Sequence, residues 1–545
     1  MTQMTRRLFA ISCAAALLLP GVGLGAQSRS FKYGQWMEIQ NAVMRELNRN
    51  YVDTLPLDRM YKDGLKAMLS DLDPYTVYVP EEEQEDFTMM ISKTYGGIGA
   101  VIYKPDKQGY VVINEPYEGS PAALAGLRCG DEIMEVDGVS TIGLNASQSS
   151  SRMKGEPGTK VLFKVKKLHA DQPVDIEITR QKIHLPDVQY AGMLDAETGY
   201  ILLSSFTDRA DEQVLDAFCM LKDRGMKRLV LDLRGNGGGL LSEAVDIVSI
   251  FVPKNTLVVS SKGVDQNIEY RTDKEPLDTQ IPILVMVDSG SASASEIVSG
   301  ALQDLDRATV AGKRTFGKGL VQSIRSLPYN GQLKVTTAKY YTPSGRCVQA
   351  IDYSHRNEDG SVGHIPDSLT HEFRTASGRI VRDGGGITPD IKVDAREYSR
   401  ITYAVVMSAL ADNYSIEFVR SHESIPPVEQ FCLSDEDYAK FVQWAAGEKF
   451  DCRTESQTYY DLLVEQMGKD GLDDKCAEAL EKLKEVVYMD KKTALETFKD
   501  EIVPFLEEEI AIRYYFQEAG VQVRLKTDSQ LKEALQKWVA TVNKD

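Results

Sequence analysis

The spacing of apolar residues divides the chain into segments with different predicted secondary structure. In residues 33–73 apolar side chains recur every three to four positions, as at Trp36, Ile39 and Val43, which predicts a helical N-terminal region. Residues 95–184 instead contain short apolar runs between glycine-rich turns. That pattern is typical of strands, so we expect a β-rich module there.

Strand-like and helix-like segments alternate in the next part of the chain. Asp211–Lys222 and Leu240–Phe251 have helical spacing. Short apolar runs flank them, at Tyr200–Phe206, Leu229–Leu233 and Ile283–Val287. Alternation of this kind predicts an α/β core.

The last third of the chain is more polar. Residues 352–383 show no period and predict an inserted loop, whereas from Glu397 onward the chain is charged and helix-like, as at Ile401–Leu410 and Tyr459–Met467. We therefore expect an α/β multidomain protein. Its predicted parts are a leader at 1–26, a helical region at 30–92, a β-rich module at 93–184, an α/β core at 185–396 and a helical region at 397–545.

The first residues predict a signal peptide. Arg6 and Arg7 precede an apolar run, Leu8–Leu24, and small residues then offer a cleavage site after Ala26. Pro20 interrupts the run, which is short for a membrane span. We therefore expect an exported protein, either periplasmic or associated with the cell envelope.

Composition and charge limit the expected partners. The 545 residues are 42% hydrophobic and 26% charged, as in soluble globular proteins. A formal net charge of −18 disfavours binding to nucleic acid. No His/Cys/Asp/Glu cluster has metal-ligand spacing, so neither a metal nor another cofactor is expected. Export would permit one disulfide among Cys432, Cys452 and Cys476, and buried free thiols are the alternative.

The string GSPAALAGLRCGDEIMEVDG at Gly119–Gly138 resembles a PDZ domain. Such a domain binds a peptide C-terminus by adding it as a strand to an open sheet edge. The peptide carboxylate needs a loop with free main-chain N–H groups, which glycines allow to approach closely. Gly97, Ile98 and Gly99, just before the apolar run Ala100–Tyr103, fit that loop.

Three further strings carry candidate chemistry: DLRGNGGG at Asp232–Gly239, SGSASASEI at Ser289–Ile297 and TFGKGLVQ at Thr315–Gln322. The second follows an apolar strand and leads into a helix, which places a serine at a helix N-terminus. A serine nucleophile needs an adjacent base, and the core has no convincing histidine. A buried lysine can serve, and Lys318 lies between two glycines in an apolar strip.

Together the strings resemble the carboxyl-terminal processing (tail-specific) peptidases, over residues 33–393. The resemblance implies a PDZ domain before a crotonase- or Clp-like peptidase core. It also implies Ser293 as nucleophile, Lys318 as base and Gln322 as its helper. It assigns the oxyanion hole to Ala294 with Gly237 or Gly238, and a supporting place to Asp304.

The resemblance implies cleavage through an acyl-enzyme, on protein or peptide substrates with free, apolar C-termini. The insertion and the long C-terminal region depart from the family pattern, which leaves regulation and homo-oligomer formation open. Two alternatives are a non-catalytic PDZ scaffold with a degenerate protease core and a crotonase-like acyl-CoA enzyme. The intact serine and lysine argue against the first, and the PDZ string and leader argue against the second.

Overall fold

The computed structural model describes residues 29–104, 108–170, 172–264, 266–357 and 361–542, which leaves the predicted signal peptide outside. The chain forms two compact units that meet at Asp71 and Leu72. The first contains α2 (Arg29–Asn50) and α3 (Leu57–Ser70), as the helical spacing predicts. The second begins with β1 (Val77–Val79), η1 (Glu81–Glu83) and α4 (Gln84–Ser92).

The β-rich module is a six-stranded sheet around an apolar core that includes Ile113, Leu127, Ile133 and Phe163. Its strands are β3 (Ala100–Tyr103), β4 (Val111–Pro116), β5 (Glu132–Val136), β6 (Val139–Ser140), β7 (Lys160–Lys166) and β8 (Val174–Thr179). Two helices, α5 (Pro121–Leu124) and α6 (Ala146–Met153), belong to it. The chain enters this module through β2 (Thr94–Gly97) and leaves it through β9 (Gln181–His184), and these two strands pair with each other.

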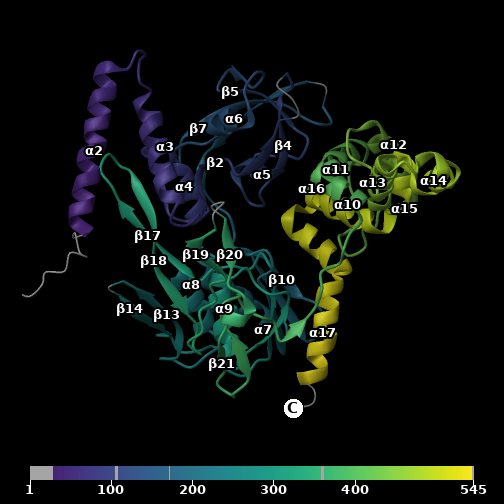
Figure 1. Ribbon diagram of the computed structural model, residues 1–545. Coiled ribbons are helices and arrows are strands. Elements are labelled where there is room, and N and C mark those ends of the chain that lie inside the picture. The colour runs from purple at the N-terminus through teal and green to yellow at the C-terminus, as the bar shows by residue number, and fades with distance from the viewer. Residues whose placement is uncertain (1–28, 105–107, 171, 265, 358–360, 543–545) are drawn as a thin grey trace, which may run out of the picture. The chain divides into compact units, whose positions relative to one another are not determined.

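The core is a six-stranded sheet in the order β10-β11-β12-β15-β16-β23, parallel except for β10. These strands are Val188–Met193, Thr198–Leu203, Arg228–Asp232, Ile283–Val287, Thr309–Gly312 and Ile391–Lys392. One face packs on α7 (Ala210–Asp223), α8 (Leu241–Ser249) and α9 (Ala294–Asp304), and the other on the C-terminal helices (Figure 1). Because both faces are covered, the inner strands contain buried apolar runs, at Tyr200–Leu203, Leu229–Leu231 and Ile283–Val287.

A second sheet of the core supplies a hairpin that borders a cavity described below. It contains β13 (Leu257–Gly263), β14 (Asn267–Arg271), β17 (Leu320–Ser326) and β18 (Gln332–Tyr341), together with β1. Its strands β17 and β18 are antiparallel neighbours.

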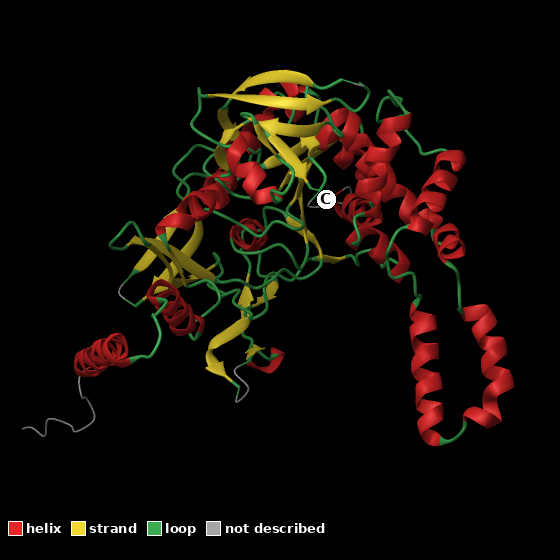
Figure 2. Ribbon diagram, turned by 90° about the horizontal axis from the view of Figure 1, so that it is seen from above, coloured by secondary structure: helices red, strands yellow, loops and turns green. Residues whose placement is uncertain are grey.

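The C-terminal region is helical, as predicted. Its helices are α10 (Arg400–Met407), α11 (Leu410–Ser421), α12 (Asp435–Gly447), α13 (Glu455–Asp470), α14 (Asp473–Val487), α15 (Lys491–Thr497), α16 (Lys499–Thr527) and α17 (Ser529–Val542). Figure 2 shows α13 and α14 as a pair of helices joined by a short loop. Helix α16 is kinked at Phe516, which has a φ of 64°. None of the described helices is long and apolar enough to cross a membrane.

Two expectations need correction. Residues 352–383 are not a plain loop, because they contain the short strands β19 (Ile351–Arg356), β20 (Val362–His364), β21 (Glu372–Arg374) and β22 (Ile380–Arg382), with η2 (Asp367–Leu369). Most of their side chains are exposed or half-buried, so no apolar alternation marks them. All six described cysteines are free thiols; only Cys129 is buried, whereas Cys219 and Cys432 are exposed.

Candidate active site

Ser293 lies at the junction of β15 and α9, at the N-cap position of the helix. Its φ of 54° and ψ of −111° are unusual for a residue with a side chain. The main chain is held on both sides, because the Ser293 N–H donates to Glu296 Oε2 at 2.9 Å and the Tyr340 hydroxyl donates to the Ser293 carbonyl at 3.1 Å. The half-buried Ser293 side chain borders a cavity of about 390 Å³.

The glycine loop after β12 lies against this serine. A Cβ at Gly238 would lie 2.8 Å from the Ser293 Cβ and 2.9 Å from the Ala294 nitrogen, so only glycine fits there. The Gly238 N–H is occupied, since it donates to Asn236 Oδ1 at 2.9 Å. Within the described part of the chain, the N–H groups of Gly237 and Ala294 have no acceptor.

Lys318 borders the same cavity from the segment that leads into β17. Its ammonium lies 4.1 Å above the centre of the Tyr75 ring. Burial, and after it the charge of Lys334, lower the pKa of Lys318 to about 8, while the charges of Glu296 and Asp73 oppose that shift. No hydrogen bond joins Lys318 Nζ to Ser293 Oγ in the described structure. Such bonds are often formed only with substrate bound.

Two further candidates are Gln322, which could orient the base, and the histidines, which could act as a base. Gln322, on β17, borders the cavity and donates from Nε2 to Thr336 Oγ1 at 3.3 Å. No histidine is among the described residues that line the cavity. The described residues also contain no cluster of three or more His, Cys, Asp and Glu side chains that could hold a metal ion.

Glu296 is a site residue that the sequence reasoning missed. Its fully buried carboxylate accepts four hydrogen bonds, from the Ser293 and Lys318 N–H groups at 2.9 and 2.8 Å, the Gly317 N–H at 2.7 Å and the Thr315 hydroxyl at 2.6 Å. One carboxylate therefore ties the serine turn to the lysine segment. The signal was present, because a glutamate three residues after an N-cap serine is the capping-box spacing.

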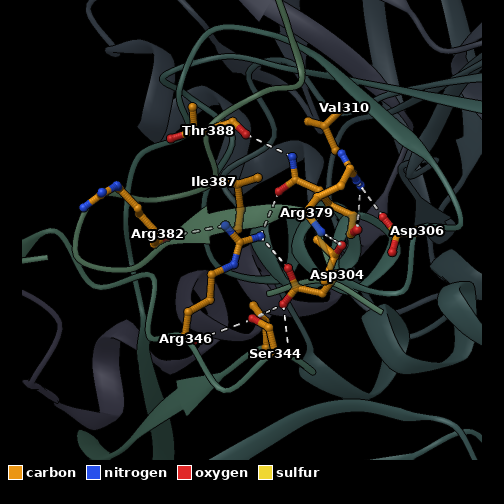
Figure 3. A network of polar contacts seen from close by, with 12 residues as sticks. Asp304, Asp306, Val310, Ser344, Arg346, Arg379, Arg382, Ile387 and Thr388 are labelled. Carbon is orange, nitrogen blue, oxygen red and sulfur yellow. Dashed lines mark hydrogen bonds and ion pairs between the residues drawn. The ribbon is translucent and has the colours of Figure 1, made fainter. Parts of the chain in front are cut away.

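Asp304 lies at the opposite end of α9 from Ser293, outside the cavity. Figure 3 shows its carboxylate facing Arg346, whose Nη2 lies 2.7 Å from Asp304 Oδ1. The other oxygen accepts from the Thr342 hydroxyl at 2.5 Å and the Ser344 N–H at 3.1 Å. This buried network fixes the segment after β18 to the end of α9, which is a structural role.

The predicted carboxylate loop connects β2 to β3. Gly97 ends β2 opposite Gln181, and the side chain of Ile98 is buried. Gly99 has a φ of 75°, and a Cβ there would lie 2.5 Å from the Ser120 Cβ. The Ile98 and Gly99 carbonyls accept hydrogen bonds within the module. The described residues provide no acceptor for their N–H groups, so both N–H groups are available to a ligand.

Comparison with known families and proteins shows three matches along the chain. Residues 197–354 match peptidase family S41, residues 112–167 match a PDZ domain, and residues 401–537 match the helical domain described as "Probable PDZ-protease, C-terminal helical domain". These matches confirm the predicted fold class and the resemblance on which it rests.

Two curated relatives cover most of the core. The carboxy-terminal-processing protease of Bartonella bacilliformis is 35% identical over 316 residues, which is 57% of this chain and 71% of the relative. A probable CtpA-like serine protease of Staphylococcus aureus (strain COL) is 36% identical over 395 residues, 71% of this chain and 75% of the relative. Among solved structures, the photosystem II D1 C-terminal processing protease is 27% identical. That comparison covers 66% of this chain and 92% of that one, with a TM-score of 0.36.

Proposed function

This chain belongs to peptidase family S41 and is a carboxy-terminal-processing serine protease with a PDZ domain, and we propose that it cleaves substrates with a Ser293–Lys318 dyad through an acyl-enzyme. The observation that carries the proposal is one cavity bordered by Ser293, Lys318 and the glycine loop. No histidine borders it among the described residues, so the lysine is the available base.

In the proposed reaction, the neutral Lys318 amine accepts the proton of the Ser293 hydroxyl as Oγ bonds to the scissile carbonyl carbon. The resulting Lys318 ammonium then gives this proton to the leaving amine, and the C-terminal fragment departs. The same amine then takes a proton from water as its oxygen attacks the ester carbonyl carbon. The Lys318 ammonium returns that proton to Ser293 Oγ as the ester C–O bond breaks, which releases the N-terminal fragment as a carboxylic acid and restores both residues. A pKa of about 8 suits this base, because a useful fraction is neutral near physiological pH.

We assign the oxyanion hole to the N–H groups of Ala294 and Gly237. The Ala294 N–H lies at the N-terminus of α9, where the helix dipole favours negative charge. Gly237 is preferred over Gly238, because the Gly238 N–H already donates to Asn236. Two main-chain donors held in place before the reaction stabilise the developing negative charge. Gln322 would then orient Lys318 with its amide oxygen as acceptor, since its Nε2 already donates to Thr336.

We further propose that the PDZ domain binds the free C-terminus of the substrate. The available N–H groups of Ile98 and Gly99 would donate to the terminal carboxylate, and the peptide would extend along β3 beside α6. The last side chain of the substrate would be apolar. We also propose a location outside the cytoplasm, in the periplasm or cell envelope, and the predicted leader supports it.

Trapping the acyl-enzyme tests the catalytic assignment. Wild-type protein would be mixed with excess substrate, quenched in acid and digested, and the peptide containing residue 293 analysed by mass spectrometry. We expect an adduct on Ser293 that is absent from Ser293→Ala. The control is Ser289→Ala, which removes an exposed serine of the same string and should leave adduct and turnover unchanged. An adduct on another residue would refute the assignment of Ser293.

A further inference from the structure

We propose that Lys334 is a second functional cation of this active site, whose charge favours the neutral, proton-accepting form of the Lys318 amine. The proposal rests on the proposed function, because it deepens the role of Lys318 as base. Lys334 acts through Lys318 and takes no proton itself.

The position of Lys334 follows from the register of the β17–β18 hairpin. Lys334 on β18 lies directly opposite Ile324 on β17, and two residues further along each strand Thr336 lies opposite Gln322. Directly opposite residues of antiparallel strands point to the same face, and residues two apart share it. Gln322, Ile324 and Lys334 all border the cavity that holds Ser293 and Lys318. The two lysines therefore border the same cavity of about 390 Å³, one from the hairpin and the other from the segment before it.

Lys334 has no counter-ion in the described structure. Among the described side chains, no carboxylate lies within 4.0 Å of its ammonium, and the one aromatic contact is the Phe87 ring, whose centre is 6.0 Å away. This is unusual in a chain with 18 more acidic than basic side chains. A half-buried cation without a partner is costly, so its position beside the catalytic base needs a functional explanation.

The charges around Lys318 show what Lys334 does there. Two carboxylates, Glu296 from α9 and Asp73 from the segment before β1, favour the ammonium form of Lys318, and the Tyr75 ring face also attracts a cation. Among the described residues, Lys334 is the one group that opposes them by charge. Without the Lys334 charge, burial alone would favour the neutral amine of Lys318. Burial lowers the pKa of Lys334 as well.

The sign of the effect is definite. Removing the Lys334 charge should raise the pKa of Lys318, so the rise of kcat/KM with pH should move to higher pH. At the high-pH plateau, where Lys318 is neutral in both proteins, the rates should converge.

The experiment compares the dependence of kcat/KM on pH, from 6 to 10, for the wild type, Lys334→Met, Lys334→Gln and Lys334→Arg. We expect the midpoint to rise by about 0.5–1 pH unit in the Met and Gln variants, with roughly three- to tenfold lower activity at pH 7. The Arg variant should keep the wild-type midpoint. Lys339→Met, which removes an exposed charge from the same strand, is the matched control and should also keep it.

Two results would overturn the proposal. One is an equal loss of activity at every pH in Lys334→Met with an unchanged midpoint, which would indicate a packing or substrate-binding role. The other is a midpoint that moves in Lys334→Arg as far as in Lys334→Met. Thermal unfolding of each variant shows whether it is folded. If either Lys334→Met or Lys334→Gln does not fold, the other neutral variant still provides the comparison. Failure of the dyad itself would be seen separately, as full activity of Lys318→Ala.

Discussion

The chemistry at the scale of single residues depends on how the main chain around Ser293 is held. A non-glycine residue in such a conformation stores strain on the order of 1–3 kcal/mol, and the surrounding bonds must maintain it. The Glu296 carboxylate and the Tyr340 hydroxyl supply those bonds. Since Glu296 also accepts a hydrogen bond from the Lys318 N–H, both residues of the proposed dyad are held by the same carboxylate.

Glu296→Gln should therefore lose activity through misplacement of the dyad. An amide offers one acceptor oxygen and one NH₂ group, so at least one of the four donors around Glu296 would face another donor. We expect a fall in kcat of about 100-fold and a stability loss of about 1–3 kcal/mol, with little change in KM. Steady-state kinetics and thermal unfolding measure both. Wild-type kcat in Glu296→Gln would show that the anchor is dispensable.

The candidate residues could be named from the sequence because each lies in a short local string. The structure brings Ser293, Lys318, Gln322, Gly237 and Gly238 to one cavity, and their roles stay predictions. The donor glycine could not be chosen from sequence, because the choice depends on where the Asn236 side chain points. Glu296 was missed for a similar reason, since its partners at 315–318 lie about 20 positions away.

The carboxylate loop between β2 and β3 is the element that should read substrate tails. Replacing Gly99 with a bulky residue is a poor probe, because its Cβ would collide with Ser120, whose hydroxyl accepts the Ala123 N–H and caps α5. The structure thus makes Gly99 necessary for the loop itself. Changing the substrate is the cleaner test.

A substrate ending in a carboxylate should be processed faster than the same substrate ending in an amide. Charge-assisted hydrogen bonds to the carboxylate are worth about 1.5–3 kcal/mol each, and an amide would place its own donors against Ile98 and Gly99. We expect at least roughly tenfold weaker capture of the amide form, seen as a higher KM in a paired assay. Equal KM values for the two forms would show that the module does not read tails.

Helices and strands could be predicted from the sequence where their burial produces a recognisable pattern of apolar residues. The strand at Ile283–Val287 has its predicted bounds, because both faces of the sheet are covered and every residue is apolar. The strands at 351–382 could not be predicted, since segments of three to six mostly exposed residues carry no periodic signal.

At the scale of the whole compact unit, α16 connects three parts of the chain. Arg513 donates to the Asn114 carbonyl of the PDZ strand β4 at 3.1 Å and pairs with Asp412 and with Glu509 at 3.3 Å. Gln517 donates to Glu115 of the same strand. Beyond the kink at Phe516, α16 and α17 pack on the core sheet.

Arg513→Met should destabilise this unit strongly. The Arg513 side chain is 1% exposed, and its loss would leave Asp412 and Glu509 without their cation. Burial already raises the pKa of Glu509 to about 7, so this carboxylate depends on Arg513 to stay charged. We expect a loss of about 3–5 kcal/mol in unfolding by urea. The control is Arg524→Met, because the Arg524 side chain is 51% exposed and pairs with Glu508 at 3.5 Å. Its loss should lower the free energy of unfolding by about 1 kcal/mol or less. Equal losses of stability in Arg513→Met and Arg524→Met would contradict this prediction.

Contacts of this range could not be read from the sequence. The helical character of the C-terminal region was evident, but Arg513 and Asn114 are separated by 399 positions, and neither stands in a recognisable motif. Local patterns report an element's own burial and not the element that covers it.

We propose above all that Lys318 is the base for Ser293. This assignment is tested by the pH dependence of kcat/KM in the wild type and in Lys318→Ala. The pKa of about 8 predicts that wild-type activity rises about tenfold per pH unit below pH 8 and levels above it. Lys318→Ala should fold normally, and its activity at pH 7 should be lower by about 10³-fold or more. Its activity should not show the rise toward pH 8. Substantial cleavage by Lys318→Ala with the same rise toward pH 8 would show that another group takes the serine proton.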